Sequence, residues 1–198
     1  MSNPVGDFAK SEIKSKEIQI ISDRVINAIN LATRLHHGHV RKDEYNTPYV
    51  SHLFAVAMLL KSVTNDEDVI IAGVMHDALE DVADYEYEDL EADCGQRVAK
   101  IVQGVTEIKS MPYQERKVNY LETLRTGMIE SVLVSTADKL HNLKSLKDVH
   151  DSHNMNKETQ ILIYREVLKI GQERLINAHG EAHPLVVALE SELESFGV

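Results

Sequence analysis

The stretch Ala72-Gly-Val-Met-His-Asp-Ala-Leu-Glu-Asp81 places one histidine and three carboxylates at the end of an otherwise apolar segment. On a continuous helix, His76 and Glu80 would lie four positions apart on one face, as would Asp77 and Asp81. Burying carboxylates without partners costs much free energy, and a bound metal ion is a common way to offset that cost. The stretch therefore predicts a metal site with spare carboxylates beside it, which is the layout of a hydrolase.

Two further residues are candidates to complete this site, because metal ligands usually come from more than one element. His52 opens a predicted helix, and Asp138 is a carboxylate within the apolar segment 134–143. With His76 and Asp77 they give two imidazoles and two carboxylates, a set that suits Mn²⁺, Fe²⁺ or Zn²⁺ better than Ca²⁺ or Mg²⁺. An octahedral ion with four protein ligands would keep positions open for water and substrate.

Each of these residues also has an ordinary structural interpretation. A single buried histidine is more often hydrogen-bonded within the core than bound to a metal. A single carboxylate in a helix, such as Asp138, is more often hydrogen-bonded or ion-paired, and the acidic run 83–93 would normally be a solvated face. The metal interpretation depends on the two histidines and two aspartates occurring together in this order.

The spacing of apolar residues predicts an all-α protein, a helical bundle with short connections. The length of 198 residues favours one domain, 1–198, with a metal-site core at about 16–150 and C-terminal helices at about 157–197. Residues 41–49 are expected to form a polar loop. Helices are expected over residues 16–37, 52–62, 66–77, 85–93 (a short helix or turn), 96–107, 112–126, 130–147, 157–178 and 183–196.

Composition narrows the class of partner. The formal net charge of -11 argues against a nucleic-acid or anionic-membrane surface, but allows a phosphorylated ligand in a local basic pocket. No apolar run approaches ~18 residues, so no transmembrane helix is expected, and the polar start of the chain carries no secretory signal. Cys94 is the sole cysteine, so a reducing cytoplasm is the simplest compartment. The composition is compatible with a homo-oligomer.

Read in order, five motifs resemble those of the HD-domain hydrolases that degrade the alarmone (p)ppGpp. The chain is more similar to the small stand-alone alarmone hydrolases than to the long bifunctional Rel/SpoT enzymes. It departs from the family pattern at Thr136 and Glu107, where lysine is usual. The motifs are Leu35-His-His-Gly-His-Val-Arg-Lys42, Thr47-Pro-Tyr-Val-Ser-His-Leu53, the opening stretch 72–81, Gly104-Val-Thr106 and Ala137-Asp-Lys-Leu-His-Asn-Leu143.

The resemblance implies an HD-domain fold and an Mn²⁺-dependent (p)ppGpp 3′-pyrophosphohydrolase, releasing pyrophosphate and GDP or GTP in alarmone turnover. It implies that Glu80 and Asp81 handle the attacking water. The residues it implies as ligands of one Mn²⁺ are His52, His76, Asp77 and Asp138. Those it implies for the nucleotide are Arg41 and Lys42 on the phosphate side and Asn142 at the base or ribose, with Tyr49, Lys139 and Ser145 as further pocket candidates.

Two alternatives stay open from the sequence. The same fold and metal could serve another nucleotide, such as (p)ppApp, NADPH or a nucleoside monophosphate, and the departures at Thr136 and Glu107 favour considering it. The second alternative is a non-catalytic nucleotide sensor, although a sensor has no need of Glu80 and Asp81. The basic pair 116–117 either stabilises charge at the site or is the solvated face of a helix.

Overall fold

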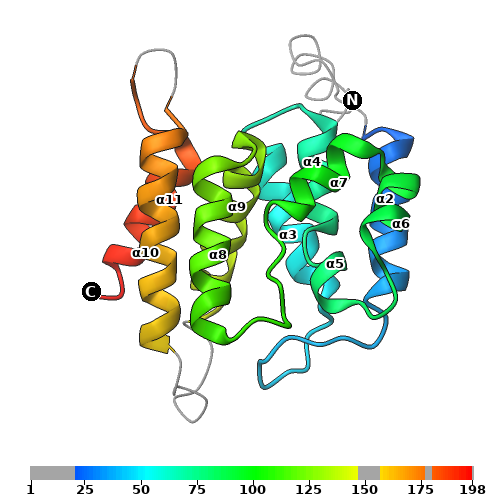
Figure 1. Cartoon of the computed structure of the whole chain (residues 1–198), viewed down its shortest axis with the longest axis horizontal. Helices are drawn as coiled ribbons and strands as arrows, with labels where there is room; N and C mark the ends of the chain where they lie inside the picture. Colours follow the sequence, from blue (N-terminus) through cyan, green and yellow to red (C-terminus); the bar gives the residue numbers. More distant parts are fainter. Residues whose placement is uncertain (1–20, 147–156, 177–179, 198) are drawn as a thin grey trace, which may run out of the picture.

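Two central helices, α4 (Glu67–Met75) and α9 (Ile129–Ser145), contact most of the others (Figure 1). The computed structural model describes residues 21–146, 157–176 and 180–197. Within these ranges the chain is helical, with β-pairing limited to two isolated bridges, so the expected all-α fold is confirmed. The other helices are α2 (Asp23–Leu35), α3 (Val50–Lys61), α5 (Ala78–Asp81), α6 (Tyr87–Cys94), α7 (Gln96–Gln103), α8 (Tyr113–Thr126), α10 (Lys157–Arg174) and α11 (Pro184–Glu194).

The α3–α4 pair forms the wall that carries both predicted histidine ligands. Residues 69–75 of α4 are all buried, so beyond its first turn this helix has no solvent face. A Cβ at Gly73 would collide with the Leu60 side chain and lie 3.4 Å from the Cα of Ala57. A side chain at this position would therefore require Leu60 to move within the tightly packed α3–α4 contact. The close packing brings His52, near the start of α3, beside His76, which follows the end of α4.

The helix expected to run into the opening stretch ends earlier than its periodicity suggests. α4 stops at Met75, residues 76 and 77 form a turn, and α5 begins at Ala78. The expectation that one continuous helix runs through residues 76–81, with its four-residue spacing, is therefore wrong. Neighbouring residues of a helix point in different directions, whereas at this turn, with Asp77 at φ −97° and ψ 0°, adjacent His76 and Asp77 reach the same place.

Other helix boundaries differ for local reasons. Ser22 accepts a hydrogen bond from the Val25 N–H and caps α2, so this helix starts at Asp23, while residues 16–20 lie outside the described residues. α7 ends at Gln103 rather than at 107 because the chain turns at Gly104. α9 ends at Ser145, and residue 147 also lies outside the described residues. α10 stops at Arg174, short of the expected 178.

The C-terminal helices α10 and α11 pack on α9, on the opposite side from α3 and α4 (Figure 1). α9 is therefore sandwiched, and most of its residues from Ser131 to Leu143 are buried. Across the described ranges, no helix combines the length and the apolarity that crossing a membrane requires.

Candidate metal centre

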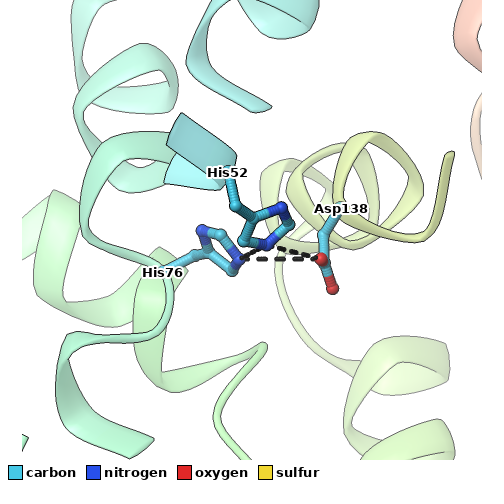
Figure 2. A group of neighbouring side chains, drawn as sticks. All are labelled: His52, His76 and Asp138. Carbon is cyan, nitrogen blue, oxygen red and sulfur yellow. Dashed lines mark hydrogen bonds and ion pairs between the residues drawn. The ribbon is translucent and has the colours of Figure 1, made fainter. Parts of the chain in front are cut away.

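Three buried side chains from three parts of the chain point toward one another (Figure 2). Nε2 of His52 lies 3.2 Å from Nε2 of His76 and 3.2 Å from Oδ1 of Asp138. His76 Nε2 is 3.7 Å from the same oxygen. One atom from each residue lies within 4.8 Å of the others, so the structure assembles three of the four predicted ligands.

The fourth predicted ligand, Asp77, borders this cluster. Its Oδ2 is 3.0 Å from Nε2 of His76 and 3.6 Å from Nε2 of His52. The hydroxyl of Tyr49 donates a 2.7 Å hydrogen bond to that oxygen. Tyr49, predicted as a substrate contact, therefore holds Asp77 in place, and the ligand role of Asp77 stays a prediction.

The hydrogen bonding of His76 shows that the cluster fits a cation. Its Nδ1 lies 2.9 Å from the carbonyl oxygen of Gly73, which can only accept. Nδ1 therefore carries a proton, so a metal ion that displaced any proton from Nε2 would find the Nε2 lone pair directed at His52 and Asp138. Imidazole lone pairs and a carboxylate this close repel one another unless a positive charge lies between them, so the site suits a divalent metal.

The electrostatics of the metal-free protein point the same way. Burial opposes a charge on His76, but the carboxylates of Asp77 and Asp138 outweigh it and raise the pKa of His76 well above its ordinary value. Burial also works against ionised Asp77, yet the neighbouring imidazole of His76 holds the pKa of Asp77 below its usual range. The two carboxylates thus draw a positive charge into the cluster.

Asp138 is fixed by two partners on its own helix. Its Oδ2 accepts from Nζ of Lys139 at 2.6 Å, and its Oδ1 accepts from Nδ2 of Asn142 at 2.5 Å. The oxygen of Asn142 in turn accepts from the Arg41 guanidinium at 3.0 Å. Nζ of Lys139 also lies 5.1 Å from the ring centroid of Tyr120. Lys139 and Asn142, both predicted to contact substrate, thus also hold a predicted ligand.

The two remaining carboxylates of the opening stretch differ in their surroundings. Burial raises the pKa of Glu80 to about 7, and the negative charges of Asp77 and Glu107 act in the same direction. An oxygen of Glu80 accepts from the backbone N–H of Glu107 at 3.2 Å. The side chain of Asp81 is partly exposed and pairs with Nζ of Lys109 at 2.5 Å. Glu80 therefore has the environment of a general base working near neutral pH.

The two departures from the family pattern lie in different places. Thr136 is fully buried, and its hydroxyl donates to the Val132 carbonyl. A Cβ on Gly171 of α10 would be 3.6 Å from that hydroxyl. Thr136 therefore packs against the C-terminal helices and does not line the cavity of the site.

Glu107, in contrast, lines the cavity beside Glu80. Its carboxylate contacts two cations of α8, with Nε of Arg116 at 2.9 Å and Nζ of Lys117 also in contact. Both cations also lie over the ring of Tyr113. The basic pair is thus largely buried against the carboxylate of Glu107 rather than fully solvated, and a role in stabilising charge at the site stays a prediction.

The ligand cluster opens into a cavity of about 170 Å³. A groove of about 1310 Å³ shares three lining residues with it, Tyr49, Asp81 and Asn142. The groove is larger than the roughly 300–1,000 Å³ of a typical ligand pocket, so it has room for a nucleotide with its phosphates. Of the predicted substrate residues, Lys139 lines the cavity but not the groove. The groove is lined by Arg41, Lys42, Tyr49, Asn142 and Ser145.

Two residues of the site were missed by the sequence prediction. His141 contacts His52, and burial lowers the pKa of His141 to about 4. It follows Asp138 by three positions, a spacing that puts both on one face of a helix and could have identified it. The backbone N–H of Glu107 reaches Glu80 because the loop after α7 folds back toward α5, and no sequence pattern predicts that path.

The HD-domain family model matches residues 28–170 of the chain. A guanosine-3′,5′-bis(diphosphate) 3′-pyrophosphohydrolase of Danio rerio, MESH1, is 39% identical over 124 residues, which cover 62% of this chain and 68% of the relative. The Homo sapiens protein of that name is 34% identical over 125 residues, covering 62% and 69%. A solved structure described as a metazoan ortholog of SpoT that hydrolyses ppGpp is 27% identical, with a TM-score of 0.78 and coverage of 90% and 98%.

Proposed function

The chain belongs to the HD-domain family, and on that premise we propose that it is a divalent-metal-dependent guanosine-3′,5′-bis(diphosphate) 3′-pyrophosphohydrolase. The observation that carries this proposal is the buried His52–His76–Asp138 cluster, which opens beside Glu80 into a cavity that shares wall residues with a groove large enough for a nucleotide. Relatives at 34–39% identity are named for this reaction. Alarmone turnover is the role that it implies.

We propose Mn²⁺ as the ion, with Fe²⁺ or Zn²⁺ as the alternatives that the mixed nitrogen and oxygen donors also suit. His52, His76 and Asp138 would hold it, and Asp77 would complete the set from the edge of the cluster. When bound, the ion acts as a Lewis acid that makes water a stronger nucleophile near neutral pH.

Glu80 takes the proton of the attacking water in this proposal. Its raised pKa of about 7 matches a general base at neutral pH. The water oxygen bonds to the phosphorus next to the ribose, and the bond from that phosphorus to the 3′ oxygen breaks. The 3′ oxygen gains a proton, so water and (p)ppGpp give pyrophosphate and GDP or GTP. Asp81, bound to Lys109, would orient the water.

The nucleotide would lie in the groove, with its phosphates toward the cavity. Arg41 and Lys42 are the cations of the groove wall nearest in sequence to the metal ligands, and Arg41 is already linked to Asp138 through Asn142. These cations would stabilise the negative charge that develops on the phosphate oxygens. The nucleotide-contact roles of Tyr49, Asn142 and Ser145 remain predictions.

The departures from the family pattern give little support to a different substrate. Thr136 packs in the core, and the carboxylate of Glu107 is already paired with Arg116 and Lys117. Other nucleotides remain the alternative that an assay has to address. A purely binding protein is disfavoured, since it would have no use for Glu80 and Asp81 beside the metal centre.

A nucleotide panel tests the proposal. Pyrophosphate and phosphate release would be measured with Mn²⁺ on ppGpp, pppGpp, their adenosine counterparts and NADPH, with identification of each product. We expect pyrophosphate and GDP or GTP from the guanosine substrates, and a loss of that release in Glu80→Gln. Cleavage of another nucleotide with ppGpp left intact would contradict the proposed substrate. Binding of ppGpp without turnover would favour the sensor.

Three expectations from the sequence stay predictions. They are the single domain 1–198, the cytoplasmic location and the homo-oligomer. The negative net charge still argues against nucleic-acid and anionic-membrane partners.

A further inference from the structure

The two histidines of the metal centre are held by different kinds of partner. Nδ1 of His76 donates to a backbone carbonyl, that of Gly73. Nδ1 of His52 instead lies 2.8 Å from Nδ1 of another imidazole, His141, with the ring centroids 4.8 Å apart. A carbonyl fixes the direction of its hydrogen bond, whereas either of two imidazoles can donate. This contact alone therefore leaves open which of the two rings donates the proton.

A metal ion at the cluster would settle this ambiguity. A histidine that binds a metal through Nε2 keeps no proton there, so the single proton of its neutral ring lies on Nδ1. His52 would then donate to His141, and Nδ1 of His141 would be an acceptor. The proton of neutral His141 would lie on Nε2. His141 also lines the groove, and among the described residues its Nε2 has no hydrogen-bond partner.

We propose that His141 is a positioning residue that holds metal ligand His52 in the tautomer with Nε2 free, and that it thereby keeps a donor N–H for an acceptor in the groove. The inference rests on the metal centre of the proposed function. Outer partners of metal-binding histidines set ring orientation and donor strength. His141 reaches both sites because it stands one turn after Asp138 on α9, with one ring edge on His52 and its ring in the groove wall.

Metal titration of three variants tests this inference. His141→Phe keeps a flat ring but removes the acceptor, and His141→Gln keeps an acceptor oxygen. His39→Phe is the matched control, because His39 also lines the groove but pairs with His36 rather than with a ligand. Mn²⁺ and Zn²⁺ affinities would be measured by calorimetry, with thermal unfolding to confirm that each variant folds.

We expect His141→Phe to weaken metal binding by roughly 10–100-fold, the range typical of lost outer partners. His141→Gln should recover most of the loss, and His39→Phe should bind metal like the wild type. Wild-type affinity in a folded His141→Phe protein would overturn the inference while leaving the proposed function intact. Failure of the wild type itself to bind metal would instead overturn the proposed function.

Nitrogen-15 spectra of the histidines give a second readout that needs no variant to fold. In the wild-type protein loaded with diamagnetic Zn²⁺, we expect the proton of His52 on Nδ1 and that of His141 on Nε2. A His141 ring protonated at Nδ1 would contradict the proposed direction of the hydrogen bond. In steady-state assays His141→Phe should also raise KM, since the groove loses a donor, and His141→Gln should restore metal affinity more fully than KM.

Discussion

The metal cavity and the groove share Tyr49, Asp81 and Asn142 in their walls but are built differently. In the cavity, each candidate ligand is buried or nearly so and has a second partner inside the protein, such as Gly73 for His76. The groove is lined largely by the loop 39–49 and by the edges of α9 and α10. Helix packing thus fixes the proposed site of chemistry, and in this proposal the more exposed side chains of the groove would select the nucleotide.

Removing a ligand tests the cavity most severely. His76→Ala should abolish metal binding and hydrolysis, a larger loss than the roughly 10–100-fold expected for outer partners. The reason is that Nε2 of His76 supplies one of three converging donors. Calorimetric metal titration and pyrophosphate release would measure both effects. His37→Ala, an exposed histidine of the same region, is the control. Full Mn²⁺ affinity in His76→Ala would rule out this ligand assignment.

Replacing the proposed base separates chemistry from metal binding within the cavity. Glu80→Gln should lower kcat by about 10²–10⁴-fold, the usual contribution of general base catalysis, with metal affinity nearly unchanged. Asp81→Asn should cost less, because Asp81 is already paired with Lys109. Glu88→Gln, on the exposed side of α6, controls for loss of charge. A larger loss in Asp81→Asn would exchange the two roles.

The same glutamate predicts how the stability of the metal-free protein depends on pH. The pKa of Glu80 is raised from 4.5 to about 7, so the folded state binds this proton more tightly than the unfolded state does. The free energy of unfolding should therefore fall as pH rises from about 4.5 to 7, by at most roughly 3 kcal/mol. Urea unfolding at several pH values would measure it. Glu80→Gln should flatten this slope, and an unchanged slope would contradict the assignment.

The ligand residues of the cavity could be predicted from the sequence, whereas the turn and the hydrogen bonds that bring them together could not. His52, His76 and Asp138 could be chosen because ligand types recur in buried helical segments, and the structure brings them together. The break at His76 and Asp77 was missed, because an apolar helical period continues through a turn that tertiary packing selects. The hydrogen bond from Tyr49 to Asp77 could not be predicted, because sequence spacing does not show which way a side chain points.

The groove should respond more mildly, and unevenly, to loss of its cations. Arg41 is partly buried and donates to Asn142, whereas Lys42 is exposed. Arg41→Gln should raise KM for ppGpp by about tenfold, equivalent to about 1.4 kcal/mol, and Lys42→Gln should raise it less, because an exposed cation is screened by salt. Steady-state kinetics at two salt concentrations would measure both. Equal increases in KM for the two variants would mean that the hydrogen bond of Arg41 to Asn142 does not strengthen its contact with the substrate. Weakened metal binding in Arg41→Gln would show that the hydrogen bonds from Arg41 through Asn142 also position Asp138 for the metal. Residues of the groove would then affect metal binding as well as substrate choice.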